Sequence, residues 1–477
     1  MNAVPSLRFL PLSDGKQPLY MWSVMFLVNR FEDPLFISRA MSVFCGMLTL
    51  IGIFLLSYTL YKSRLISFLS SFFWAVSPYS VFFDRMAMAD SMLAMFGVWA
   101  LFFTVLAVRF HRFDFAMLAG FALGGALLTK SPAVYFVILL PLVLILSPWP
   151  ERKEKEKAGM REFIHLIKKL PIYIPIYLIS FFMYNILRLG ENFHMISSRN
   201  MDYVYPISHL WISPFNPLKI NLTNTFDFFW ILGPSVLVTF FLFSVIYNSK
   251  IDFVKMKKKV NPATALLFLW IAVPVLLTCL YAKTLTARYL LFVFPAFCIF
   301  SSLVFENLHS KNKLLGKVLI FGLLIYSYQA IYSNTRLLSH PEKMPLPRIE
   351  RSGYLEEWTA GTGIKEVSLF LRSEYLKDPD LEMVVGTEGY FGTLPDGLQV
   401  YLNDLPGIVV IGTGLDFNQI PESLIESKKA GNRTYFVVNS TRLNTDYHDL
   451  NLKLLNSFEK ARKPDGTKEL LYFFEVM

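Results

Sequence analysis

The sequence predicts a polytopic α-helical membrane protein that ends in a small extracytoplasmic α/β domain. Three observations predict this class. Of the 477 residues, 54% are hydrophobic and 17% are charged, whereas soluble domains carry about 25% charged residues. Long apolar runs follow one another through the first two thirds of the chain, and a membrane helix needs about 20 such residues. After residue 333 the apolar runs shrink to the length of strands.

The chain divides into three predicted parts. Residues 1–34 form the remnant of a first outer loop, with an interfacial helix over 19–31 whose aromatic residues suit the edge of a bilayer. Residues 35–333 form a transmembrane bundle of about ten spans, and residues 334–477 form a soluble domain. The spans are expected at 35–61, 65–83, 91–108, 115–129, 133–146, 171–187, 228–247, 263–281, 290–305 and 316–332.

The C-terminal part alternates short apolar runs with helical stretches. Runs at 383–386, 408–412 and 435–438 have the length of strands, and segments 364–376 and 421–429 have a helical pattern. Such alternation is typical of a small α/β domain.

Basic residues gather in alternate loops of the predicted bundle. Because short cytoplasmic loops carry an excess of Lys and Arg, the basic loops at 62–64, 109–112, 152–169, 250–259 and 311–317 are predicted to be cytoplasmic. This bias also accounts for the net charge of +10, so no nucleic-acid partner is predicted. The remaining loops and the C-terminal domain then lie on the extracytoplasmic face of the plasma (inner) membrane.

Scarce ionisable residues fall on that outer face. A charge at the bilayer centre costs about 3 kcal/mol, so Asp90, Lys16, Lys130 and Arg288 are expected at a membrane edge or in a wet cavity. Lys and Arg beside an apolar groove suit a phosphate-bearing lipid, and a carboxylate suits the base that activates an incoming hydroxyl. Asp90 and Asp14 are the candidate catalytic carboxylates.

Structural roles are the alternatives for the same residues. Asp90 can pair with Arg85 or with a lipid headgroup, Lys130 can extend toward the interface, and Arg288 can act as an interfacial anchor. The three cysteines lie within apolar runs and are expected to be small core residues. No cluster has the spacing of a metal site, so no metal ligand is predicted and a need for a divalent metal stays open.

Four segments in order resemble motifs of one glycosyltransferase superfamily. The segment KQPLY at 16–20 is similar to a Lys-Pro-Pro-Leu segment, and Arg85 and Asp90 match an Arg followed shortly by Leu-Thr-Asp. LTKSP at 128–132 is similar to Leu-Thr-Lys-Gly-Pro, and Arg288-Tyr289 to a late Arg-Tyr. The chain therefore resembles the GT-C glycosyltransferases of the protein O-mannosyltransferase and lipid A aminoarabinose transferase type (family 39-like). The segment WTAGTG at 358–363 looks like that of a bacterial branch.

The resemblance implies a hexosyl- or pentosyltransferase, mannosyltransferase-like, that moves a sugar from a polyprenyl-phosphate donor to an extracytoplasmic protein, lipid or glycan, with inversion. It implies donor-phosphate binding by Lys16, Arg85, Lys130, Arg288 and Tyr289. Because such enzymes usually begin with another helix followed by a catalytic acidic pair, we expect this sequence to be a fragment or to have a mispredicted start. Its own activity is then in question. The alternative is that Asp14 or Asp90 acts as the catalytic base alone.

Two other functions remain as alternatives. A transporter or flippase of a lipid-linked substrate would place ionisable groups near the midplane of paired repeats. An envelope scaffold would use the C-terminal domain to bind a partner. The sequence identifies neither the sugar nor the acceptor nor the oligomeric state.

Overall fold

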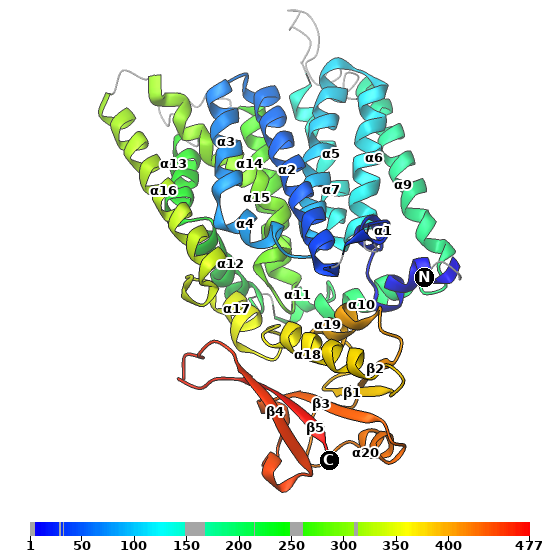
Figure 1. Cartoon of the computed structure of the whole chain (residues 1–477). Helices are drawn as coiled ribbons and strands as arrows, with labels where there is room; N and C mark the ends of the chain where they lie inside the picture. The colour runs from blue at the N-terminus through cyan, green and yellow to red at the C-terminus, as the bar shows by residue number, and fades with distance from the viewer. Residues whose placement is uncertain are drawn as a thin grey trace, which may run out of the picture. The chain divides into compact units, whose positions relative to one another are not determined.

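The computed structural model describes residues 5–27, 30–31, 33–147, 167–213, 215–248, 261–309 and 313–477. The chain forms two compact units, Met1–Pro345 and Leu346–Met477. The first unit is a bundle of membrane helices, and the second is built around a mixed β-sheet (Figure 1). The predicted boundary after residue 333 falls inside the last helix of the bundle, whereas the two units divide after Pro345.

Helices account for most of the first unit. In chain order they are α1 (Leu19–Met25), α2 (Pro34–Tyr61), α3 (Arg64–Val76), α4 (Pro78–Asp84), α5 (Asp90–Phe110), α6 (Phe113–Thr129), α7 (Val134–Leu139), α9 (Tyr173–Asn185), α10 (Met195–Tyr203), α11 (His209–Ile212), α12 (Leu218–Leu232), α13 (Ser235–Asn248), α14 (Pro262–Tyr281), α15 (Phe294–Ser302) and α16 (Lys313–Ser339). Short 3-10 helices precede α1 (Pro5–Asp14), follow α7 (Leu140–Leu146) and precede α15 (Ala287–Val293).

Among the described residues, six helices are long and apolar enough to cross a membrane, and two bent helix pairs raise this number to eight. Two shorter apolar helices, Phe113–Thr129 and Ser131–Leu146, lie where two further spans are predicted. The fold class predicted from composition, a multi-span helical membrane bundle with an α/β domain, is confirmed; ten complete crossings stay a prediction.

Two predicted spans are not straight. The run predicted at 65–83 bends by 54° between α3 and α4, where Ser77 caps α4 and Pro78 occupies its first turn. The run predicted at 228–247 breaks by 114° between α12 and α13, at Gly233 and Pro234. Proline cannot donate the backbone hydrogen bond that a continuous helix requires, so the break follows from the sequence.

The helices α2 and α5 end sharply at the same end of the bundle. Lys62 ends α2 and His111 ends α5, both with a left-handed backbone of φ 55° that stops helical hydrogen bonding. The short turn after His111 makes α6 antiparallel to α5, so the start of α5 and the end of α6 share one end of the bundle.

The second unit contains a five-stranded sheet with the order β2-β1-β3-β5-β4. Strands β1, β2 and β3 are parallel, and β5 runs antiparallel to both β3 and β4. The predicted strands correspond to β1, β2 and β3, while β4 and β5 were not predicted. The elements are α17 (Arg348–Arg351), α18 (Ile364–Lys377), β1 (Met383–Thr387), α19 (Thr393–Leu402), β2 (Ile408–Gly412), α20 (Glu422–Lys429), β3 (Arg433–Asn439), β4 (Leu452–Glu459) and β5 (Leu470–Val476).

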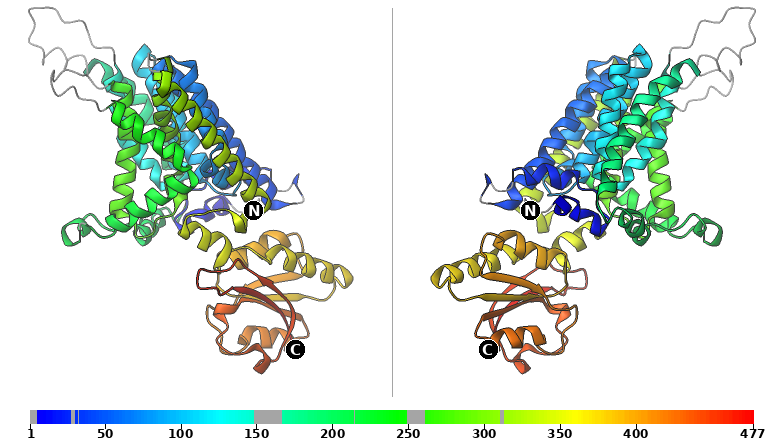
Figure 2. Two further views of the ribbon diagram at one scale, coloured as in Figure 1. Left: turned by 90° about the vertical axis from the view of Figure 1, so that its left-hand side faces the viewer. Right: turned by 90° about the vertical axis from the view of Figure 1, so that its right-hand side faces the viewer.

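Helices cover both faces of this sheet (Figure 2). On one face α18 and α19 pack over Val385, Val437 and Phe473. On the other face α20 packs over Phe436 and Phe474 through Leu424. Alternate residues of β3 therefore enter two separate cores, as the two-residue period of a strand requires.

Candidate functional site

The residues predicted as a site gather at the end of the bundle where α5 begins and α6 ends. Asp90 is the first residue of α5, and Lys130 directly follows the last residue of α6. The chain returns to this end again after α14, where Arg288 and Tyr289 start a 3-10 helix. Figures 1 and 2 show α10 and α11 across the same end of the bundle.

Asp90 and Lys130 form a direct ion pair. Lys130 Nζ donates to Asp90 Oδ1 at 2.6 Å, and the two side chains are 24% and 6% exposed. The ammonium group carries three N–H donors, so two remain after this bond. A buried carboxylate would be costly without such a partner, so each charge makes the burial of the other possible.

Aromatic and sulfur groups surround the cations. Lys130 Nζ lies 4.8 Å from the ring centroid of Tyr289, and the guanidinium carbon of Arg288 lies 5.2 Å from the same ring. Arg288 also donates to Met88 Sδ at 3.4 Å. The face of an aromatic ring attracts cations, so Tyr289 holds two positive side chains at one place.

The N-terminal segment reaches this end through a small apolar cluster. Leu12 is fully buried against Leu128 at the end of α6 and Leu187 after α9. Gln17 Nε2 donates to Ser131 Oγ at 2.8 Å, which fixes the residue after Lys16 beside the residue after Lys130. Lys16 in turn pairs with Asp14 at 2.5 Å, and both of these side chains are half exposed. The segment that carries the exposed Asp14–Lys16 pair is therefore bonded to the segment that follows the buried Asp90–Lys130 pair.

Tyr20 connects the same segment to the loop before α5. Its hydroxyl donates to Ser38 O at 2.6 Å and lies 2.9 Å from Ser42 Oγ. Ser42 Oγ then donates to Met88 O at 3.1 Å. The KQPLY segment is therefore held through α2 against the loop that carries Arg85 and Asp90.

The outer loop approaches the N-terminal segment at Gly15. Its backbone has φ +68°, and an added Cβ would lie 2.5 Å from Arg199 Cβ and 2.9 Å from Met195 O of α10. Only glycine permits this approach with that backbone. Arg199, a residue outside the predicted set, pairs with Asp202 at 3.4 Å next to the Asp14–Lys16 pair.

Two charged residues lie in the turn between α4 and α5. Arg85 caps the end of α4, with its guanidinium carbon 6.0 Å from the ring centroid of Phe82. Asp84, which was not a predicted site residue, packs its carboxylate against Gly46 of α2. Among the described residues Asp84 Oδ1 has no hydrogen-bond partner. In the sequence, Asp84 could have been identified as a candidate from its position directly before Arg85, between two apolar runs.

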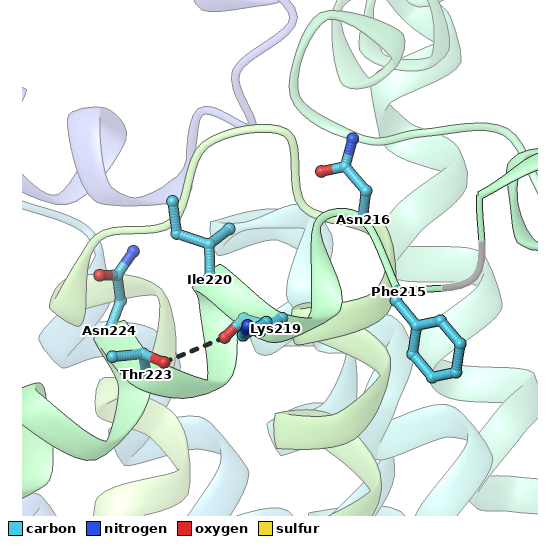
Figure 3. Close-up of a pocket in the computed structure, with 6 residues that line it drawn as sticks. All are labelled: Phe215, Asn216, Lys219, Ile220, Thr223 and Asn224. Atoms are coloured by element: carbon cyan, nitrogen blue, oxygen red, sulfur yellow. Dashed lines mark hydrogen bonds between the residues drawn. The ribbon is translucent and has the colours of Figure 1, made fainter.

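An open hollow of about 400 Å³ lies at the start of α12 (Figure 3). Ile220 and Asn224, one helical turn apart, point to the same side, and Thr223 Oγ1 donates back to Lys219 O at 3.1 Å. The hollow contains none of the predicted site residues. In the described part of the chain, no group of three or more His, Cys, Asp or Glu is arranged to hold a metal ion.

Comparison with known families gives a direct match. Residues 15–173 match the family described as dolichyl-phosphate-mannose-protein mannosyltransferase. This range includes the first three of the four motifs, Asp90 and Lys130, so the resemblance inferred from those motifs is confirmed. A comparison with curated proteins found no match.

Two solved structures match over 96% or more of the chain. The crystal structure of ArnT from Cupriavidus metallidurans in the apo state has a TM-score of 0.51 and 15% identity, over 98% of this chain and 93% of that chain. The structure of the same protein bound to undecaprenyl phosphate has a TM-score of 0.50 and 14% identity, over 96% and 88%. At such identities the similarity shows the fold.

Proposed function

We propose that this chain, a GT-C glycosyltransferase of the protein O-mannosyltransferase-like family, transfers a sugar from a polyprenyl-phosphate donor at the end of the bundle that carries Asp90 and Lys130. The observation that carries the proposal is that Lys130, which is paired with the buried Asp90, and Arg288 both lie beside the ring of Tyr289. The similar ArnT was solved with undecaprenyl phosphate, which supports this donor class.

Cations bind the donor phosphate in this proposal. Lys130 keeps two N–H donors, and Arg288 offers a planar fork that suits two phosphate oxygens. Lys16, 61% exposed, and Arg85 add positive charge at the same end. Stabilising the phosphate as its negative charge develops makes it a good leaving group, so no strong acid is needed.

The two carboxylates have different accessibility and therefore different roles. Asp90 is almost fully buried and holds Lys130, so it positions a phosphate-binding group. Asp14 is half exposed beside Lys16, so an acceptor hydroxyl can approach it. Asp14 is then the base that removes the hydroxyl proton. The oxygen attacks the sugar carbon opposite the departing phosphate, and this single displacement inverts the configuration.

The active end faces the outside of the plasma membrane. The basic loops predicted to be cytoplasmic include 62–64 and 109–112, which lie at the end of the bundle opposite Asp90. The lipid bilayer holds the polyprenyl tail, and the acceptor is an extracytoplasmic protein, lipid or glycan.

Three substitutions and one matched control test this function. Purified protein is given undecaprenyl-phosphate sugars and an extract of envelope acceptors, and transferred sugar is measured. Asp14→Asn is expected to lower kcat roughly a hundredfold or more, because the base is lost. Lys130→Met and Asp90→Asn are expected to raise the KM for the donor roughly tenfold or more.

Asp114→Asn provides the control, because Asp114 pairs with Arg112 in an exposed ion pair at the other end of the bundle. It is expected to leave both constants unchanged. Near-normal transfer by Asp14→Asn and Lys130→Met would refute the proposed site. A transporter or flippase would move the lipid and leave its sugar–phosphate bond intact.

A further inference from the structure

The strand order of the second unit contains a switch point between β1 and β3. From β1 the chain passes through α19 to β2 on one side, and from β2 it passes through α20 to β3 on the other side. The two helices lie on opposite faces of the sheet. In open α/β sheets such a switch opens a crevice outside the carboxyl ends of the strands, where ligands bind.

Buried polar side chains lie at this carboxyl edge. Glu388 follows β1, and its two carboxylate oxygens accept from the backbone N–H and the side-chain amide of Asn439, each at 2.7 Å. Asn439 ends β3, and its amide oxygen accepts from Lys460 Nζ at 2.6 Å. All three residues are at most 4% exposed. A network that buries both charges at one edge holds the loops there rigidly.

Large aromatic side chains project from the first of these loops. Tyr390 and Phe391 are 72% and 76% exposed, between Gly389 and Gly392, whose φ values are +73° and +108°. The loop is fixed to the neighbouring one, because Gly389 N donates to Gly414 O at 2.6 Å. Two exposed aromatic rings on a rigid loop leave apolar surface in contact with water, which is unfavourable in free energy. A bound ligand would cover this surface.

Polar groups lie in the neighbouring loops. Arg442, after β3, lies 3.8 Å from Asp416, and its guanidinium carbon is 5.5 Å from the ring centroid of Trp358. Among the described residues Arg442 Nε has no hydrogen-bond partner, although it is buried. Asp416 is 65% exposed and Trp358 is 43% exposed. The edge therefore combines aromatic rings with a carboxylate and a guanidinium.

We propose that this edge, formed by the loops 388–392, 413–416 and 440–442 with Trp358, binds a saccharide chain. A sugar ring has apolar C–H faces that pack on aromatic rings, and hydroxyls that pair with carboxylate and guanidinium groups. The binding does not depend on the transfer reaction proposed for the first unit.

A phosphate compound fits this edge less well. One N–H group at the start of α19 already has a partner, because Asp396 Oδ2 accepts from Gly392 N at 3.0 Å. Asp396, Asp416 and Glu388 outnumber the cations Arg442 and Lys460 around these loops, and this excess of negative charge disfavours an anion. A neutral sugar suffers no such repulsion.

The test measures binding to the full chain in phospholipid nanodiscs, without sugar-based detergents. The probes are mannotetraose, cellotetraose and chitotetraose, with inorganic pyrophosphate as the anionic alternative, and binding is followed by saturation-transfer NMR and titration calorimetry. At least one tetrasaccharide is expected to bind at millimolar concentration. The double substitution Tyr390→Ala with Phe391→Ala, and Asp416→Ala alone, are each expected to weaken binding roughly tenfold or more.

Leu376→Ala is the matched control, because Leu376 is 66% exposed at the end of α18, which leads to the amino end of β1. It is expected to leave binding unchanged. Hydrogen exchange of β3 checks that each variant stays folded. The proposal is wrong if no tetrasaccharide binds, if the aromatic variants bind as well as the control, or if only pyrophosphate binds.

Discussion

At the scale of single residues, two buried carboxylates of this protein are held by side chains of opposite charge. Asp90 is held by Lys130, and Glu356, which has no exposed surface, is held by Arg348 and Arg351 at the start of the second unit. Removing Lys130 would leave the buried charge of Asp90 uncompensated, and removing both arginines would do the same to Glu356. The need to compensate these buried charges therefore constrains which residues can occupy the positions, in addition to any role in catalysis.

Lys460 gives a pH dependence that follows from burial. Burial lowers the pKa of Lys460 from 10.5 to about 8, although Glu469, Glu388 and Glu357 oppose the shift and Lys463 adds to it. Between these two values the folded state binds fewer protons than the unfolded state, so the free energy of unfolding rises with pH. Between pH 7 and pH 10 we expect this residue to raise the free energy of unfolding of the second unit by about 2 kcal/mol.

The measurement compares the wild-type chain with Lys460→Met. Hydrogen exchange of the β3 amides, corrected for the intrinsic pH dependence of exchange, reports the free energy of opening at each pH. The difference between the two proteins should shift in favour of the wild type as the pH rises. A constant difference would mean that Lys460 keeps its ordinary pKa when folded.

At the scale of elements, small residues decide how closely the helices approach. An added Cβ at Gly120 of α6 would lie 2.9 Å from Pro175 O and 3.0 Å from Ile176 O of α9. At Gly124 of the same helix it would lie 2.5 Å from Met183 Sδ, which is the mobile part of a side chain. Close approach at small residues is a common basis of helix packing in membranes.

Gly120→Ala should therefore destabilise the bundle more than Gly124→Ala, although the nearest contact at Gly124 is shorter. Backbone carbonyls can move only if α9 moves. A change of rotamer can move Met183 Sδ away from the added Cβ and leave only the contact with Met183 Cβ at 3.0 Å. We expect the free energy of unfolding to fall by about 2 kcal/mol for Gly120→Ala and by about 1 kcal/mol for Gly124→Ala, measured by SDS titration of purified protein. Equal losses, or a reversed order, would show that α9 shifts freely.

At the scale of the whole molecule, the path of the chain through the bundle explains the site. Successive helices return the chain to one end at Asp90, Lys130 and Arg288. These residues are far apart in the sequence, and alternate crossings of the bundle bring them together. The loops rich in Lys and Arg lie at the other end wherever the structure describes them. The segments 148–166, 249–260 and 310–312 lie outside the described residues.

Cysteine labelling tests which end faces outward. The native Cys45, Cys279 and Cys298 are at most 1% exposed, so they give a low background. In intact cells a membrane-impermeant maleimide should label Lys219→Cys and Asp14→Cys. Asp114→Cys, at the opposite end, should be labelled only after the cells are opened. The reverse pattern would place the proposed site in the cytoplasm.

The sequence by itself determined the fold class, because apolar runs of membrane-spanning length need no knowledge of their neighbours. It also indicated β1 and β3, whose apolar runs are mostly buried, and β2, whose apolar run is only partly buried. The strand β4 was missed because its residues are largely exposed, which leaves a pattern close to that of a loop. The strand β5 was also missed, although most of its residues are buried. The sequence pattern did not predict its antiparallel pairing with β3 either.

The tertiary structure alone decided how the candidate residues meet. The sequence supplied Asp90, Lys130 and Tyr289 as candidates, but not the ion pair at 2.6 Å or the ring beside it. It gave no sign of the hydrogen bond from Gln17 to Ser131 or of the edge formed by Tyr390, Asp416 and Arg442. The physical reason is that periodicity records which face of an element is buried, whereas contacts between distant residues depend on how all the elements pack together.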